Sequence, residues 1–186
     1  LERLKEAVDT LQAAGYDVTP KQVDVSSSSS IHELAETANN LGRIRAVIHT
    51  AGVSGAQADV RKVLEINLLG TAMMLHTFES YATQGTVGVM IASMAGHIPL
   101  PGMEELQSAL AKNSVGAIWN YMRNAKITES SHAYSLSKYG NIMQVRLNAS
   151  HWAQKGARLI SISPGVIASP MAATEQAESN EIEQLL

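Results

Sequence analysis

The stretch Arg45-Ala46-Val47-Ile48-His49-Thr50-Ala51-Gly52 indicates the fold class of this 186-residue chain. Its apolar run has the length of a buried strand, and the small residues behind it allow the backbone to approach a ligand closely. Further apolar runs occur at 87–92 and 158–163. Segments with helical periodicity lie between and around these runs, at about 31–41, 59–82 and 131–154. This alternation predicts an α/β fold in which right-handed crossovers join parallel strands.

The residues ahead of this pattern predict one more helix and one more strand. Leucine and valine recur at helical spacing over 1–14, and Gly15 follows as a stop. Alternating valines predict a strand within 16–25 that ends at Asp24-Val25. Five serines, 26–30, come next. A flexible linker is one interpretation, but the capping-box spacing of Ser30-Ile31-His32-Glu33 favours a short loop and a helix start.

Both ends of the chain interrupt a helical pattern. Leu1 opens it without a capping residue in front, and the apolar spacing of Ile182, Leu185 and Leu186 is cut short. We therefore expect a fragment, or the ordered part of a longer chain. Residues 1–186 are expected to form a single partial domain.

Composition limits the classes of function. The chain is 45% hydrophobic and 17% charged, as in soluble globular proteins, and its net charge of -3 gives no support for nucleic acid or an anionic membrane as partner. It has no Cys, which excludes disulfides and fits a cytoplasmic location. No apolar run reaches the ~20 residues that span a bilayer, and no signal peptide is recognisable. The six His form no ligand pair, so no metal site is expected.

Tyr134 and Lys138 are the first candidates for chemistry. Residues four apart lie on one face of a helix, and an ammonium beside a phenol lowers the pKa of that phenol. The pair could therefore act as a general acid and base near neutral pH. The spacing is common by chance, and a solvated helical pair is the competing interpretation.

Ser93 and Asn67 are the next candidates. Ser93 directly follows an apolar run, where its hydroxyl could bond a substrate oxygen or simply end a strand. Met94, beside it, is expected to line the substrate pocket. Asn67 interrupts an apolar helical stripe, and a buried amide needs partners, either in a structural hydrogen bond or in a polar relay.

The order of these features resembles the short-chain dehydrogenase/reductase family. The resemblance rests on Asp24-Val25, Ala51-Gly52, Asn67, Ser93, Tyr134-x-x-x-Lys138 and Pro164-Gly165. It implies a Rossmann-like doubly wound parallel sheet, seen here without its first two strands and its last strand. Tyr134 would be the catalytic acid/base, Lys138 would hold the nicotinamide ribose, and Ser93 would orient the substrate oxygen. Asn67 would hold a water that links Lys138 to solvent.

The resemblance also implies a cofactor, NAD or NADP, and its contacts. Asp24 and Val25 would meet the adenine. Thr50, Ala51 and Gly52 would lie along the adenine ribose, and Pro164, Gly165, Ile167 and Ser169 would line the nicotinamide side. The implied reaction is hydride transfer between nicotinamide and a secondary alcohol or ketone, such as a hydroxysteroid or another apolar alcohol. The alternatives are a non-catalytic nucleotide- or protein-binding relative and an epimerase or dehydratase. Family members are usually homo-oligomers, so a dimer or tetramer is expected.

Three departures from the family pattern stand out. The glycine-rich phosphate loop is absent from the given residues, and whether it precedes Leu1 is open. His49-Thr50 replaces the usual Asn-Asn. Ser93 and Tyr134 are 41 positions apart, which indicates an insertion at about 97–131. This resembles the branch that includes bacterial 3α-hydroxysteroid dehydrogenase/carbonyl reductase. The insertion is expected to cap an apolar pocket, to reshape a subunit interface or to be a mobile loop.

Overall fold

The sheet has three parallel strands in the order β1-β2-β3. The computed structural model describes residues 2–168, so Ser169 and the apolar positions predicted near the C-terminus lie outside the described residues. The strands are β1 (Ala46–His49), β2 (Val87–Ile91) and β3 (Arg158–Ile162). Val47 aligns with Gly88, and Gly88 aligns with Leu159. These strands confirm the parallel α/β fold that the apolar runs predicted.

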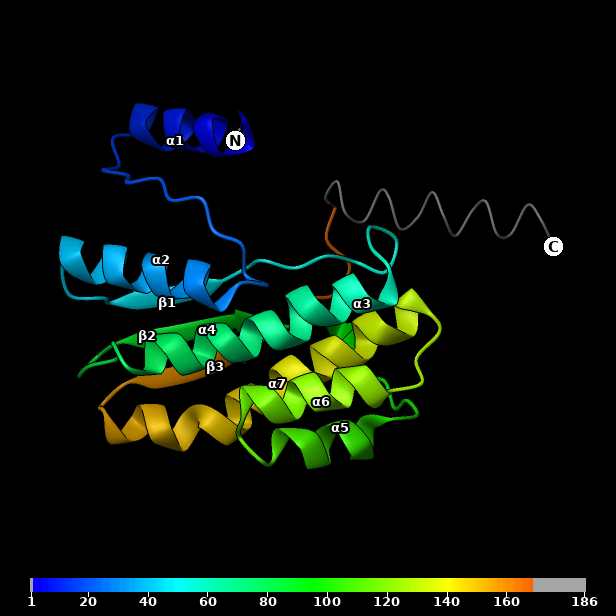
Figure 1. Ribbon diagram of the computed structural model, residues 1–186. Coiled ribbons are helices and arrows are strands. Elements are labelled where there is room, and N and C mark those ends of the chain that lie inside the picture. The colour runs from blue at the N-terminus through cyan, green and yellow to red at the C-terminus, as the bar shows by residue number, and fades with distance from the viewer. Residues whose placement is uncertain (1, 169–186) are drawn as a thin grey trace.

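Helices account for most of the remaining ordered chain (Figure 1). They are α1 (Glu2–Ala13), α2 (Ser28–Leu41), α3 (Val60–Val63), the π-helix η1 (Leu64–Leu69), α4 (Gly70–Glu79), the 3₁₀-helix η2 (Met94–His97), α5 (Met103–Leu110), α6 (Val115–Asn124) and α7 (Ser130–Gln154). Helix α4 packs on β1, and α7 packs on β2 and β3. No helix in the described part of the chain is long and apolar enough to cross a membrane.

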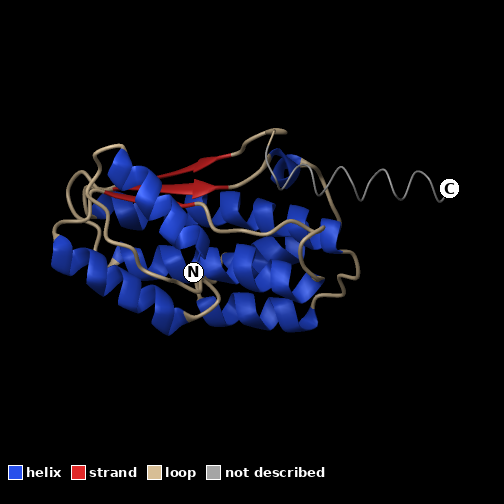
Figure 2. Ribbon diagram, turned by 90° about the horizontal axis from the view of Figure 1, so that it is seen from above, coloured by secondary structure: helices blue, strands red, loops and turns tan. Residues whose placement is uncertain are grey.

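The two faces of the sheet differ in burial. Successive side chains of a strand point to opposite faces. Val47, Met90 and Leu159 are buried, whereas Ile48 and Ile162 are 64% and 47% exposed. Figure 2 accordingly shows the strands along one side of the molecule and most of the helices on the other. The described helices therefore cover one face of the sheet.

Trp152 anchors α7 to this covered face. Its side chain is fully buried, and Gly88 of β2 leaves room for it. A Cβ at Gly88 would lie 2.9 Å from the Trp152 ring and 2.7 Å from Leu159. The lack of a side chain at Gly88 thus lets α7 lie close to the strands, and the opposite end of α7 carries Tyr134 and Lys138.

Two predictions near the N-terminus are wrong. Residues 16–25 form no strand, because a strand must pair with a neighbour and β1 pairs only with β2 among the described residues. The second helix begins at Ser28, and its cap lies three residues before the cap predicted at Ser30. Ser27 is the cap, and its hydroxyl accepts from the backbone N–H of Ser30. The predicted first helix does form and ends at Ala13, just before the turn at Gly15, but none of its residues is buried.

The helix predicted over 59–82 forms in three pieces. Asp59 caps α3 by accepting from the backbone N–H of Lys62 at 2.8 Å. The chain then widens into η1 for six residues and returns to α-helical geometry at Gly70. A Cβ at Gly70 would lie 2.9 Å from the carbonyl oxygen of Val25, so this glycine lets another segment pass close by.

The segment predicted as an insertion contains α5 and α6. Helix α5 packs on α7, and α6 packs on η1. Leu106 of α5 would lie 3.5 Å from a Cβ on Gly140, so the small residue in α7 allows a close approach. The insertion therefore forms a packed helical pair within the described structure.

Candidate active site

Ser93 lies just beyond the carboxyl end of β2. Its hydroxyl caps η2 by accepting a 3.2 Å hydrogen bond from the backbone N–H of Ala95. Two backbone bonds fix the segment against the chain leaving β3: Ala92 donates to Ile162 at 2.8 Å, and Met94 donates to Pro164 at 2.9 Å. Because Ser93 accepts its one described bond, its hydroxyl hydrogen remains available for an oxygen in the site.

Lys138 reaches the same strand end from α7. Its Nζ donates to the carbonyl oxygen of Ile91 at 3.0 Å and lies 5.7 Å from the centroid of the Tyr134 ring. Burial lowers the pKa of Lys138 to about 8. The predicted Tyr134–Lys138 pair thus shares one helix face, and that face is turned toward Ser93's strand rather than toward bulk solvent.

Glycines set the close approach of the site loops to α7. A Cβ on Gly96 would lie 2.7 Å from backbone atoms of Lys138 and Tyr139. A Cβ on Gly55 would lie 2.8 Å from the backbone of Ser130 and Ser131. Any side chain at these positions would push two backbone segments apart. Gly96 therefore sets the separation of the Ser93 loop from α7, and Gly55 sets that of the loop after β1.

Asn67 connects the turn after β1 to α7. Its Oδ1 accepts from the backbone N–H of Val53 at 2.9 Å, and its Nδ2 donates to the Val53 carbonyl at 2.8 Å. The same Nδ2 donates to Ser137 at 3.2 Å. The buried amide predicted from the apolar stripe therefore does have partners, and they belong to two different segments of the site.

His49 ends β1 in a buried position. Its Nε2 lies 3.1 Å from Oγ1 of Thr71, which donates to the carbonyl oxygen of Asn67 at 2.7 Å. Thr71 uses its hydrogen in that bond, so His49 is the donor to Thr71. Burial, reinforced by the charge of Lys138, lowers the pKa of His49 to about 4. The ring is thus neutral at physiological pH.

One cavity of about 320 Å³ collects most of the predicted site residues. Its lining includes Thr50, Gly52, Ser93, Met94, Tyr134, Lys138, Pro164, Gly165 and Ile167. Val53, Ile91, Ala92, Ala95 and Val166 also line it and were not predicted, although each is close in sequence to a residue that was. Asn67 lies behind this lining, against Gly52, where a Cβ would come within 3.2 Å of its Oδ1.

Three predicted cofactor residues do not line this cavity: Asp24, Val25 and Ala51. Ser26 donates its hydroxyl and its backbone N–H to one oxygen of Asp24, at 2.6 and 2.9 Å, and these bonds lower the pKa of the Asp24 carboxyl. In this arrangement Asp24 shapes the turn before α2. Helices α5 and α6 contribute nothing to the cavity, so the insertion does not cap it.

Comparison with known proteins agrees with this geometry. The family model of short chain dehydrogenases matches residues 1–109, a range that includes Asn67 and Ser93 and ends before Tyr134. The short-chain dehydrogenase/reductase bsc3 of Alternaria brassicicola is 32% identical over 183 residues, covering 96% of this chain and 66% of the relative. The chain belongs to the short-chain dehydrogenase family.

Solved structures show the same fold at low sequence identity. The 3α-hydroxysteroid dehydrogenase from Pseudomonas sp. B-0831, complexed with NADH, has a TM-score of 0.70 and 22% identity, over 84% of this chain and 62% of that one. A variant of actinorhodin polyketide ketoreductase with NADPH has a TM-score of 0.73 and 21% identity, over 97% and 63%. The chain thus spans slightly less than two thirds of the length of each of these three relatives.

Proposed function

We propose that the protein is an NAD(P)-dependent oxidoreductase that interconverts a secondary alcohol and a ketone. The observation that carries this proposal is the meeting of Ser93, Tyr134 and Lys138 in one cavity at the carboxyl end of β2. Open parallel sheets bind their ligands at this edge. The relatives with NADH and NADPH, together with the family membership, support a dinucleotide as cofactor.

The chemistry of the donors fits the ribose and nicotinamide of such a cofactor. Lys138 has three N–H donors and uses one on Ile91 in the described structure, which leaves two for ribose hydroxyls. Gly52 keeps the space beside Lys138 open, since a Cβ there would lie 3.5 Å from Nζ. Pro164, Gly165 and Ile167 also line this cavity. When bound, the nicotinamide would supply or accept the hydride.

The protein side of the reaction then follows from the geometry. Ser93 donates its free hydroxyl hydrogen to the substrate oxygen and holds it near the phenol of Tyr134. Tyr134 takes the proton of the alcohol during oxidation and returns it during reduction. The ammonium of Lys138 favours negative charge on the phenol oxygen. Asn67 acts as a positioning residue through its hydrogen bonds to Val53 and Ser137.

Tyr134→Phe in the full-length protein tests this assignment. Nicotinamide absorbance would be followed with a panel of secondary alcohols and ketones. The substitution removes the proton-transferring oxygen, so kcat should fall roughly 10²–10⁴-fold while the fold is retained. Tyr139→Phe is the matched control, because the Tyr139 hydroxyl bonds Gln107 on the other side of α7. Full activity in Tyr134→Phe would refute the assignment.

The substrate class that fits best is an apolar alcohol, hydroxysteroids included. Ile91, Met94, Val166 and Ile167 give the cavity apolar walls, and the exposed thioether of Met94 is flexible enough to adapt to a bulky ring. Within the substrate panel, kcat/KM should therefore rise with the apolar surface of the alcohol. A preference for small polar alcohols would exclude this class.

We further propose a cytoplasmic homo-oligomer, a dimer or tetramer. The absence of Cys supports the cytoplasmic location. The homo-oligomers usual in the family support the dimer or tetramer. Light scattering on the full-length protein would measure the mass in solution, and a monomer at micromolar concentration would contradict it. Fractionation of cells would test the location.

A further inference from the structure

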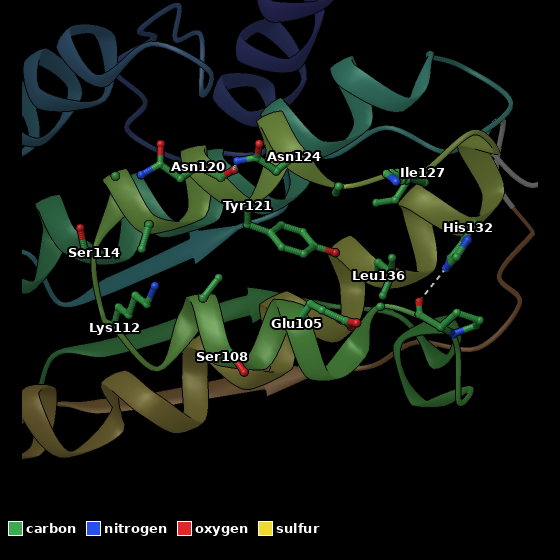
Figure 3. Close-up of a pocket in the computed structure, with 17 residues that line it drawn as sticks. Glu105, Ser108, Lys112, Ser114, Asn120, Tyr121, Asn124, Ile127, His132 and Leu136 are labelled. Atoms are coloured by element: carbon green, nitrogen blue, oxygen red, sulfur yellow. Dashed lines mark hydrogen bonds between the residues drawn. The ribbon is translucent and has the colours of Figure 1, made fainter.

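A second, larger cavity of about 1160 Å³ lies between α5 and α6, beside the start of α7 (Figure 3). Its lining shares no residue with the cavity at Ser93. His132 and Leu136 line it, and each is two residues from Tyr134. Two residues turn a helix by about 200°. The second cavity therefore lies on the opposite face of α7 from Tyr134, and the cavity is large enough for a small organic molecule.

The inner part of this cavity is apolar. Ala109 and Leu136 are buried, and Ala117 and Ile127 are half-buried; each belongs to a different segment of the lining. Figure 3 shows the Tyr121 ring lying across the space between α6 and α5, with its hydroxyl directed toward the Leu136 side. An apolar body that enters the cavity would thus meet methyl groups and one aromatic face.

Tyr121 and the exposed Glu105 both line this cavity. Within residues 2–168 the hydroxyl of the half-buried Tyr121 makes no hydrogen bond, and the carboxylate of Glu105 makes neither a hydrogen bond nor an ion pair. Burial, and then the charge of Glu105, raise the pKa of Tyr121 to about 12, so the phenol stays neutral. A carboxylate and an electron-rich ring face thus border the same space.

Two lysines and a histidine also line the cavity: Lys112, Lys126 and His132. Lys112 lies seven residues after Glu105, beyond the end of α5. Figure 3 shows it near Ser114, at the far end from His132. Lys126 follows the end of α6, and His132 bonds the carbonyl of Pro101 at 2.9 Å. No lysine or arginine within residues 2–168 pairs with the Glu105 carboxylate.

We propose that this cavity binds an amphipathic amine, with its apolar body on Ala109, Ala117 and Leu136 and its ammonium group between Glu105 and Tyr121. A carboxylate attracts the positive charge, and the face of a tyrosine ring adds a cation–π interaction. The site is distinct from the alcohol site proposed above. Its occupancy does not require turnover or a cofactor.

Three probes with one ring and different charge test the proposal: cyclohexylmethylamine, cyclohexylmethanol and cyclohexanecarboxylate. Each would be titrated by calorimetry into the full-length protein. The amine should bind one saturable site roughly tenfold more tightly than the alcohol, and the carboxylate should bind most weakly. Equal affinities, a preference for the carboxylate, or no saturable binding of the amine would overturn the proposal.

Glu105→Gln should lower the affinity for the amine to that for the alcohol. Tyr121→Leu should lower the affinity for the amine more than the affinity for the alcohol. Glu104→Gln is the matched control, since Glu104 precedes Glu105 on α5 but does not line the cavity. Amine affinity that survives Glu105→Gln would also refute the site. Tyr134→Phe should leave amine binding unchanged, whereas loss of binding there would place the amine in the catalytic cavity. The outcome of these binding measurements does not depend on whether the proposed oxidoreductase activity is found.

Discussion

Asn67 and Val53 are joined by two hydrogen bonds that run in opposite directions. The side-chain amide of Asn67 accepts from the Val53 N–H at 2.9 Å and donates to the Val53 carbonyl at 2.8 Å. A backbone segment bound in this way can neither slide nor rotate against its partner without losing both bonds. The pair therefore fixes the turn after β1, which includes Gly52, against the π-helical segment.

Replacing the amide with a carboxylate tests this relationship. Asn67→Asp would place an oxygen against the Val53 carbonyl and bury a charge, so the free energy of unfolding should fall by about 1–3 kcal/mol. Denaturant unfolding measures the change. Asn40→Asp, on the exposed side of α2, should cost no more than about 1 kcal/mol. Equal losses of unfolding free energy in the two variants would show that the two hydrogen bonds between Asn67 and Val53 contribute nothing specific.

Gly96→Ala should separate the Ser93 loop from α7. The added Cβ would lie 2.7 Å from the Lys138 backbone, so we expect a loss of about 1–3 kcal/mol in the free energy of unfolding and a lower kcat. Gly116→Ala is the control: its Cβ would meet nothing closer than Ser114 Oγ at 3.6 Å, and a helical alanine should be neutral or stabilising. Full activity and stability in Gly96→Ala would contradict the proposed spacing.

The burial of Lys138 predicts a rise in stability at alkaline pH. Its pKa in the folded protein is about 8, below the ordinary 10.5, so between these values the unfolded chain binds more protons. The free energy of unfolding therefore gains a contribution that increases with pH over this range. Lys138→Met should remove that rise and stabilise the protein at pH 7 by on the order of 1–3 kcal/mol, while turnover is lost. Denaturant unfolding curves across the alkaline pH range measure the free energy of unfolding. Lys5→Met on α1 is the control and should leave its rise with pH intact.

The burial of His49 predicts a loss of stability at acidic pH. Its folded pKa of about 4 lies below the ordinary 6.5, so the unfolded chain takes up the proton first as the solution is acidified. Stability that is present above pH 6.5 should decline as the pH falls toward 4. His49→Asn should flatten this decline, whereas His32→Asn on the exposed face of α2 should not. An unchanged acid limb in His49→Asn would show that other groups cause it.

The sequence predicted the strands and the strand-end residues because both depend on local pattern. An apolar run of four or five residues followed by small or polar residues places His49 and Ser93 at strand ends whatever lies elsewhere in the chain. The face of α7 that carries Tyr134 and Lys138 likewise follows from helical spacing. The failed strand at 16–25 has the same local pattern, but pairing depends on a neighbour that local pattern does not specify.

Features that depend on distant partners were not predictable in this way. An α-helix and a π-helix use the same residue types, so nothing in 64–69 indicates the change of pitch around Asn67. The bond from Lys138 to Ile91 joins residues 47 positions apart. One signal was present for the insertion: Leu136, Met143 and Leu147 form an apolar stripe on α7 opposite Tyr134. That stripe indicates a second layer over α7, which α5 provides.

The backbone contact at Gly96 also bears on how this chain tolerates change in length. Ser93 and Tyr134 are 41 positions apart along the chain. Even so, Gly96, three residues after Ser93, contacts the backbone of Lys138 in the helix that carries Tyr134. The intervening segment leaves this junction after His97 and returns before Ser130, and it contributes no residue to the lining of the cavity at Ser93. The exposed connection between α5 and α6, residues 111–114, can therefore change in length or sequence without changing the lining of that cavity, whereas the buried Leu106 packs against α7.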